Sequence, residues 1–473
     1  MKRLKKIQKK WLILLLIVLV VGVLMLVSVS RYFSSGGTLP LAQLLPADTQ
    51  KLLALLLLAL PVLLLLLLGV VLLVQDKDED SQVQTLIAPE TVYAAENLPG
   101  TASADTPENE AEATAERFCM LCEIDRKSTS YGHQSYEKGV TLESFCRNFR
   151  NYAASQLKLY YDIGDIRQFI AGLAVSKLVI LQGMSGTGKT SLAHAFGSFT
   201  DNGSTVIPVQ PMWKERTDLI GYYNEFTKRF NETLLLEKMY EANYSADMYI
   251  TVLDEMNIAR VEYYFAEFLS LLELPDPNER FLEVVSDKWD TDPRQFIDGR
   301  ILLPRNMWFI GTANNDDSTF AISDKVYDRA MILNLDAKSE RFSAPATSKC
   351  PISAQQFGEL VDNAIKEFGI SKRNLARLEV MDQYLIDHFH ITFGNRIMKQ
   401  IKTYIPVYVA CGGDELTALD DILAKKVIRK LETQNPIYLR NASENLLSFI
   451  DELFGDDKMS LCKEYIIRLQ RNA

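Results

Sequence analysis

The segment that most constrains the fold is KLVILQGMSGTGKTSL, which begins at Lys177 and places a glycine-rich turn between two regular elements. Residues 178–181 form a short apolar run typical of a buried strand, and the residues after the turn favour a helix. Glycines in such a turn let backbone N–H groups point inward at the β- and γ-phosphates of a nucleotide, and a lysine adds positive charge there. Because a GxxxxGKT match alone arises by chance, the flanking strand and helix carry part of the argument. The predicted nucleotide-binding residues are Gly183, Met184, Ser185, Gly186, Thr187, Gly188, Lys189, Thr190 and Ser191, with the Thr190 hydroxyl as a ligand of Mg²⁺.

A second buried strand is predicted over residues 249–253, which are apolar and partly β-branched and are followed by two adjacent carboxylates. Adjacent residues that leave a strand point in different directions. Asp254 can therefore hold the Mg²⁺ shell while Glu255 faces the attacking water as a general base. The second carboxylate favours an enzyme, a P-loop nucleoside triphosphatase, over a pure nucleotide-binding switch.

The residues after this strand predict a helix that packs one face on the sheet. Apolar side chains recur there at helical spacing, and we expect them to be core residues: Ile258, Val261, Phe265, Phe268, Leu269 and Leu272.

Two long uncharged runs, residues 11–29 and 52–74, lie near the N-terminus. Each is close to the length at which a helix crosses a bilayer core of roughly 30 Å, and transmembrane helices tolerate the proline in the second run. Lys and Arg are concentrated in residues 1–10, so the positive-inside rule places the N-terminus in the cytoplasm. We therefore expect a multi-pass protein of the inner, cytoplasmic membrane, with residues 30–51 as a short external loop and the rest of the chain in the cytoplasm. A cleaved signal peptide and a buried soluble hairpin are the alternatives.

Residues 75–117 are rich in Asp, Glu, Ala, Thr and Pro and poor in apolar residues, which predicts a flexible acidic linker. An interaction role for this acidic run is the alternative. The whole chain has a formal net charge of −10. Because gripping a polyphosphate backbone needs clustered Lys and Arg, direct nucleic-acid binding is not expected.

The six cysteines are spread along the chain, and only Cys119 and Cys122 are close together. Their spacing relative to His133 and Cys146 is irregular for a zinc site, so we expect free or buried thiols in a reducing compartment. His388 and His390 are likewise expected to be packing or surface residues.

Two further segments carry a specific resemblance. LPRNMWFIGTANNDDSTFAISDKVYDRA begins at Leu303, and FGNRIMKQIKTYIPVYVACGG begins at Phe393. Together with the motifs above, they resemble the McrB-like, dynein-related branch of AAA+ proteins, which also includes the MoxR chaperones, over residues from about 145 to 435. The resemblance implies an α/β fold: a P-loop AAA+ domain with a parallel sheet over residues 176–345, a small helical lead-in over 118–175, and an α-helical lid and C-terminal region over 346–473.

The resemblance also implies roles for single residues. Asn314 is the sensor 1 residue that orients the lytic water, with Asn315 as the alternative register. Arg329 lies where the family places the arginine finger that reaches a neighbouring subunit's γ-phosphate, which requires a homo-oligomeric ring. The expected ring is a hexamer. A surface arginine paired with Asp328 or Asp324 is the alternative for Arg329. Arg396 matches the sensor 2 position of the lid, and the stretch from Trp213 to about Tyr240 resembles an insertion that faces a pore or a partner.

The expected function is a membrane-anchored AAA+ motor that hydrolyses ATP with Mg²⁺ and remodels a protein client. GTP is the alternative substrate, because McrB uses it. Two alternative functions are a McrB-like motor subunit coupled to a nuclease partner and a membrane scaffold that uses nucleotide only to assemble.

Overall fold

The computed structural model describes residues 116–132, 135–314, 319–336 and 339–472, all within one compact unit. In this described part, no helix combines the length and the apolar character needed to cross a membrane. The two predicted transmembrane helices and nearly all of the predicted linker lie outside the described residues, so those predictions stand untested.

The centre of the unit is a five-stranded parallel sheet in the order β2-β5-β8-β1-β9. The alternation of side chains buries both faces: Val179 and Leu181 of β1 enter one core cluster, while Leu178 and Ile180 enter the other. The α/β fold with a parallel sheet is thereby confirmed. The strands are β1 (Leu178–Gly183), β2 (Thr205–Pro208), β5 (Tyr249–Asp254), β8 (Met307–Asn314) and β9 (Met331–Asn334).

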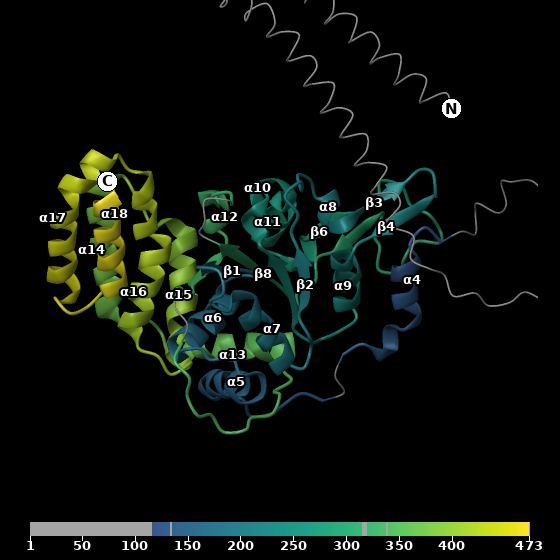
Figure 1. The fold of residues 1–473 in the computed structure, drawn as a ribbon, viewed down its shortest axis with the longest axis horizontal. Coiled ribbons are helices and arrows are strands. Elements are labelled where there is room, and N and C mark those ends of the chain that lie inside the picture. The colour runs from purple at the N-terminus through teal and green to yellow at the C-terminus, as the bar shows by residue number, and fades with distance from the viewer. Residues whose placement is uncertain (1–115, 133–134, 315–318, 337–338, 473) are drawn as a thin grey trace, which may run out of the picture. The chain divides into compact units, whose positions relative to one another are not determined.

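Helices cover the two faces of the sheet (Figure 1). One face is covered by α5 (Leu142–Leu157), α6 (Ile163–Val175) and α7 (Lys189–Phe199), which meet in a cluster of phenylalanines that includes Phe149 and Phe196. The other face carries α9 (Leu234–Ala242), α10 (Val261–Tyr264) and α11 (Ala266–Glu273). The helix predicted over residues 258–272 is thus wrong as a single element, because a 3-10 turn η3 (Met256–Ile258) precedes α10 and the chain bends at Phe265. Its apolar residues do pack in or against the core.

Short elements extend this second face. They are α4 (Cys119–Arg126), η2 (Ser128–Ser130), α8 (Thr217–Ile220), the hairpin β3 (Gly221–Asn224) with β4 (Arg229–Glu232), η4 (Pro277–Glu279) and the hairpin β6 (Phe281–Glu283) with β7 (Arg300–Leu302).

The lead-in is fixed by Arg117, whose side chain is 1% exposed and binds Asp292 through Nε at 2.7 Å and Nη2 at 2.8 Å. The boundary predicted at residue 117 therefore needs correction, because Arg117 belongs to the folded unit and not to a linker.

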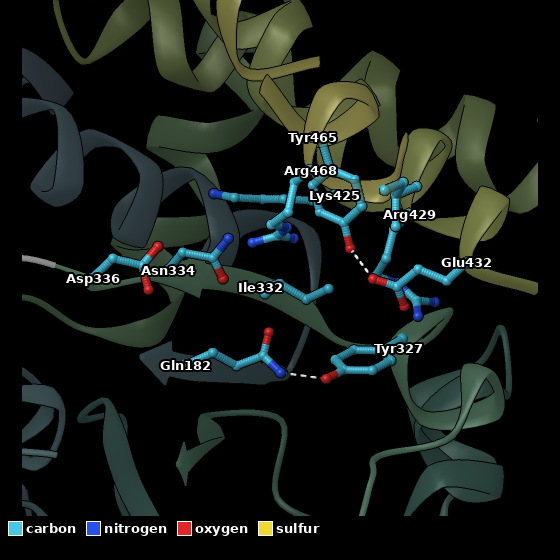
Figure 2. A pocket seen from close by; sticks show the side chains of 11 residues that line it. Gln182, Tyr327, Ile332, Asn334, Asp336, Lys425, Arg429, Glu432, Tyr465 and Arg468 are labelled. Atoms are coloured by element: carbon cyan, nitrogen blue, oxygen red, sulfur yellow. Dashed lines mark hydrogen bonds between the residues drawn. The ribbon is translucent and has the colours of Figure 1, made fainter. Parts of the chain in front are cut away.

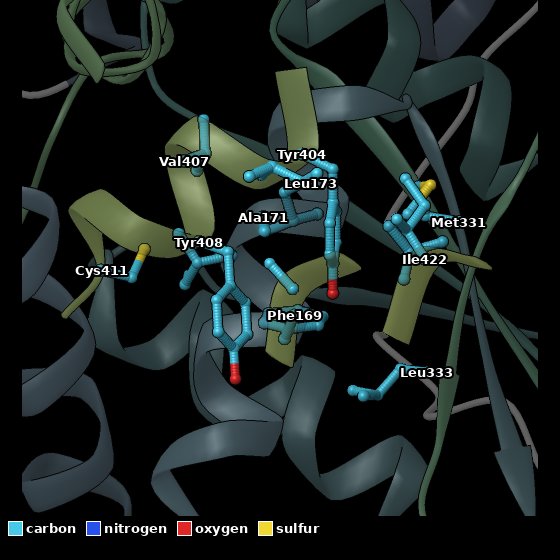
Figure 3. Packing of buried hydrophobic residues seen from close by; sticks show 14 of the residues in the cluster. Phe169, Ala171, Leu173, Met331, Leu333, Tyr404, Val407, Tyr408, Cys411 and Ile422 are labelled. Carbon is cyan, nitrogen blue, oxygen red and sulfur yellow. The ribbon is translucent and has the colours of Figure 1, made fainter. Parts of the chain in front are cut away.

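After α12 (Asp324–Tyr327) and β9, the chain forms a helical region over residues 354–472 that we call the helical lid. Helix α15, with Tyr404 and Val407, packs along α6, and these two residues share one apolar cluster with Ile422 of α16 and Met331 of β9 (Figure 3). The lid is thus joined to the edge strand of the sheet by a continuous apolar core. Its elements are α13 (Ala354–Glu367), α14 (Lys372–Phe389), α15 (Gly394–Ala410), α16 (Glu415–Lys426), η5 (Ile428–Thr433), α17 (Pro436–Phe454) and α18 (Ser460–Asn472).

Candidate active site

The glycine-rich turn between β1 and α7 has a backbone that only glycine fits. Gly183 has φ +144, and a Cβ there would lie 2.2 Å from the carbonyl oxygen of Leu335. Gly188 has φ +95 and directly precedes the first turn of α7. Met184, Ser185 and Gly186 are exposed, so the loop presents its backbone to solvent at a helix N-terminus, which is a favourable place for an anion.

Lys189 begins α7 and is buried, with 7% of the residue exposed. Its Nζ donates to the carbonyl oxygens of Gly183 at 3.0 Å and Met184 at 2.7 Å. The ammonium group is therefore already held within the loop that would receive the phosphates.

Three side chains converge beside the loop. Period-2 alternation turns Asp254 of β5 and Thr312 of β8 toward the face covered by α7, the same face as Val252 and Ile310. Asp254 Oδ1 accepts hydrogen bonds from Thr190 Oγ1 at 2.7 Å and from Thr312 Oγ1 at 2.8 Å.

This donor set fits a hard divalent cation. Mg²⁺ prefers hydroxyl and carboxylate oxygens, and the oxygens of Thr190 and Asp254 are already in direct contact. These two residues are the predicted metal ligands.

Glu255 is exposed and has an unusual backbone for a non-glycine residue, with φ 53 and ψ 45. Such left-handed conformations cost about 1–3 kcal/mol and are kept only where surrounding contacts impose them. Here the backbone N–H of Glu255 donates to Thr312 Oγ1 at 2.8 Å. Thr312 therefore holds both the Asp254 carboxylate and the backbone of Glu255 beside the loop.

Asn314 is the last residue of β8 and is level with Gly183 of β1, so it lies at the same sheet edge as the loop. The Asn257 amide donates to the Asn314 carbonyl at 3.0 Å and to Thr319 Oγ1 at 3.0 Å. Asn314 and Asn257 line a cavity of about 650 Å³ together with Thr319 and Phe320. Asn315, the alternative sensor, lies outside the described residues.

Arg329 lies near the amino-terminal ends of the parallel strands, opposite the carboxyl ends that carry the loop. Met331, two residues later, is level with Val179, and Gly183 is four residues further along β1. At roughly 3.3 Å per residue, the Arg329 backbone lies about 20 Å from the phosphate loop along the strand direction. The structure therefore does not bring Arg329 to the nucleotide loop of its own chain.

Arg329 and Arg396 share one partner. Arg329 Nη2 lies 2.8 Å from Glu273 Oε2, and Arg396 Nη2 contacts Oε1 of the same carboxylate. The alternative pairing of Arg329 with Asp324 or Asp328 is wrong, because those acids pair with cations of the helical lid, Arg429 and Lys430. Arg396, predicted for nucleotide binding, is thus placed beside Arg329 and not at the loop of its own chain.

The helical lid also grips the backbone around Arg329. Gln400 Nε2 of α15 donates to the Asp328 carbonyl at 3.1 Å, and Lys426 Nζ of α16 donates to the carbonyls of Tyr327, at 2.7 Å, and Ala330. Burial lowers the pKa of Lys426 to about 7. The lid therefore holds the backbone on both sides of Arg329.

A polar cavity of about 370 Å³ lies between part of β9 and the helical lid, and Gln182, the residue before the loop glycine, lies on its wall (Figure 2). Its cations already have partners within the chain: Lys425 pairs with Asp421 at 2.5 Å, and Arg468 lies over the Tyr465 ring. The cavity lies where the sheet and the lid meet, and on its wall Gln182 Nε2 donates a hydrogen bond to the Tyr327 hydroxyl.

The remaining cysteine and histidine candidates are separate. Cys119 is exposed, whereas Cys122 is buried and burial raises the pKa of its thiol to about 12. His388 stacks on Tyr384 at the surface of the lid.

Sequence reasoning missed three residues that organise the site: Thr312, Asn257 and Glu273. Thr312 could have been found, because a threonine two positions before Asn314 on a predicted strand must share its face. Asn257 and Glu273 contact residues that are far away in the sequence, and no sequence pattern indicates those contacts.

The comparisons with known proteins bear on this site. Among solved structures, the chain is similar to NtrX from Brucella abortus at 15% identity and TM-score 0.25, covering 65% of this chain and 66% of that one. It is also similar to a full-length MCM homolog from Methanopyrus kandleri at 12% identity and TM-score 0.32, covering 66% and 58%. The chain thus spans less than two thirds of either structure's length, and no curated protein matches it.

Residues 178–330 match the family model described as the AAA domain of the dynein-related subfamily. The matched segment begins at β1 and ends directly after Arg329, so it contains the phosphate loop, Asp254, Glu255 and Asn314. The match supports a nucleotide-hydrolysing AAA domain in these residues.

Proposed function

We propose that the chain is an Mg²⁺-dependent nucleoside triphosphatase that uses hydrolysis, in a homo-oligomeric ring, to remodel a protein client. The observation that carries the proposal is the convergence of Thr190, Asp254 and Thr312 beside the glycine-rich loop, with Glu255 fixed next to them. ATP is the favoured substrate, since most AAA+ proteins hydrolyse it, and GTP is the alternative.

In this proposal the loop holds the phosphates. Backbone N–H groups of residues 184–190 face the β- and γ-phosphates, and Lys189 exchanges its two carbonyl partners for phosphate oxygens. Thr190 and Asp254 would hold Mg²⁺, which when bound offsets the negative charge of the phosphates.

Hydrolysis is assigned to Glu255 and Asn314. Glu255 accepts a proton from water as the water oxygen bonds to the γ-phosphorus and the bond to the β-phosphate oxygen breaks. Asn314, level with Gly183, orients that water. Arg329 of a neighbouring copy stabilises the negative charge that develops on the transferred phosphoryl group. Each Arg329 is assigned to a neighbouring copy because it lies too far from the phosphate loop of its own chain.

Membrane attachment is part of the proposal. It rests on the uncharged runs at residues 11–29 and 52–74, and it places the hydrolytic domain on the cytoplasmic side of the inner membrane. The client would then be a membrane or membrane-proximal protein.

The test is hydrolysis by the detergent-solubilised full chain, compared between the natural protein and Glu255→Gln. Loss of a general base lowers the rate by about 10²–10⁴-fold, while nucleotide affinity should be kept because the loop is untouched. Glu267→Gln is the matched control, since Glu267 is a half-buried acid on α11 that pairs with Arg216. Equal rates for Glu255→Gln and the natural protein would overturn the mechanism.

A further inference from the structure

Glu273 is a carboxylate whose two oxygens are divided between two arginines from different parts of the fold. Oε2 lies 2.8 Å from Arg329, in the segment before β9, and Oε1 contacts Arg396, at the start of α15. Among the described residues, Glu273 is the polar partner recorded for each of these guanidinium groups, and Arg329 Nε is buried with no hydrogen-bond partner. Both arginine side chains therefore depend on one acid for their placement.

The fold holds this acid firmly. Glu273 is the last residue of α11, which is anchored in the core by Phe268 and Leu269. The chain after the helix is fixed by Arg280, whose Nε and Nη2 donate to the Leu274 carbonyl at 3.2 and 2.7 Å. The negative end of the helix dipole adds to the attraction of cations at this position.

The charges explain why one acid is needed. Two guanidinium groups side by side repel each other, and the sequence neighbours Asp324 and Asp328 are engaged by Arg429 and Lys430. With Glu273 between them, the three groups carry a net charge of +1. Each arginine uses one terminal nitrogen on the carboxylate and has further N–H donors, since a guanidinium carries five.

We propose that Glu273 is a positioning residue that holds Arg329 and Arg396 together as one cationic clamp for the triphosphate bound to a second copy of the chain. This inference rests on the proposed function, because the clamp lies about 20 Å along the strand direction from the loop of its own chain, at roughly 3.3 Å per residue. Glu273 itself touches no substrate. It sets where the two donors point when the copies meet.

The experiment mixes two full-length variants in detergent and measures ATP hydrolysis. The first variant, Glu255→Gln, cannot hydrolyse but supplies the arginines, and the second, Arg329→Ala, keeps its own loop and carboxylates. Hydrolysis in the mixture then comes from sites of the second variant that meet Arg329 of the first. Adding Glu273→Ala to the first variant should lower kcat of the mixture by roughly 10–100-fold with KM unchanged, the loss expected when a catalytic group is misplaced by about 1 Å.

Two further variants separate positioning from folding. Glu273→Gln keeps hydrogen bonding without the charge and should give an intermediate rate, and its thermal midpoint checks that the fold is kept. Glu267→Ala, added to the first variant instead, removes the neighbouring ion pair of α11 with Arg216 and should leave the mixture's rate unchanged.

The outcomes are distinct. If the two starting variants do not complement each other, hydrolysis across copies is wrong, and the clamp falls with the proposed function. If they complement and Glu273→Ala leaves the rate equal or raises it, the positioning role alone is overturned. A raised rate would mean that Glu273 sequesters the arginines.

Discussion

Thr312→Val tests whether one buried hydroxyl organises the candidate catalytic centre. Thr312 is 3% exposed, and its hydroxyl donates to Asp254 at 2.8 Å and accepts from the backbone N–H of Glu255 at 2.8 Å. Valine has nearly the same shape, so the change removes the two hydrogen bonds with little change in packing. A lost bond to a carboxylate and a stranded backbone N–H together cost about 3 kcal/mol.

That cost translates into two measurable effects. In a unit of this size the entropy of unfolding per residue implies that each kcal/mol lowers the thermal midpoint by about 1–2 °C, so we expect a decrease of roughly 3–6 °C. Glu255 also loses the contact that holds its left-handed backbone, and misplacing a general base by about 1 Å lowers kcat by roughly 10²-fold. Thermal unfolding and ATP hydrolysis of the full chain measure both effects.

Two control variants make the result specific. Thr312→Ser keeps the hydroxyl and loses one methyl group, so it should cost only about 1 kcal/mol and retain most of kcat. Thr251→Val makes the same substitution on the neighbouring strand, at a buried hydroxyl that has no hydrogen-bond partner among the described residues, and should be neutral or stabilising. If Thr312→Val behaves like Thr251→Val, the reasoning about Thr312 is refuted.

Three other changes have defined outcomes. Arg117→Met leaves buried Asp292 unpaired and should cost about 3–5 kcal/mol in thermal unfolding, and adding Asp292→Leu should recover part of that loss. Burial lowers the pKa of Lys426 to about 7 from 10.5, so between these values the unfolded chain binds more protons and stability rises with pH. The midpoint of the natural protein minus that of Lys426→Met should therefore grow from pH 7 to 9, and a constant difference would contradict the burial argument. Gly183→Ala places a Cβ 2.2 Å from a carbonyl oxygen just after β9 and should weaken nucleotide binding more than roughly tenfold, whereas Gly203→Ala, with open space around it, should not.

The elements that carry the loop and the carboxylates follow from local sequence. The glycine spacing from Gly183 to Gly188, the apolar run before it and the two acids at the end of β5 all report on neighbours in the chain, and the structure brings Thr190 and Asp254 into contact. Period-2 alternation extends this reasoning to Thr312, because it shares a strand face with Asn314.

Contacts between distant segments could not be predicted in the same way. Glu273 joins two arginines that are separated from it by long stretches of chain, and Arg117 finds Asp292 across several elements. The bend at Phe265 was missed because apolar spacing reports which side of a helix is buried and not whether the helix continues. Geometry of the lid was therefore the least predictable part of the candidate site.

The phosphate loop and Arg329 lie at opposite ends of the strands of the sheet. Under the proposed hydrolysis across copies, each copy would carry halves of two different catalytic centres. Where centres form only at contacts between copies, an open row has one fewer complete centre than it has chains, and closing the row into a circle supplies the missing one. The proportional gain on closure is largest for small assemblies. The hydrolysis rate per chain would then be proportional to the number of contacts between copies. Dilution should therefore abolish hydrolysis at concentrations where the chain is still folded.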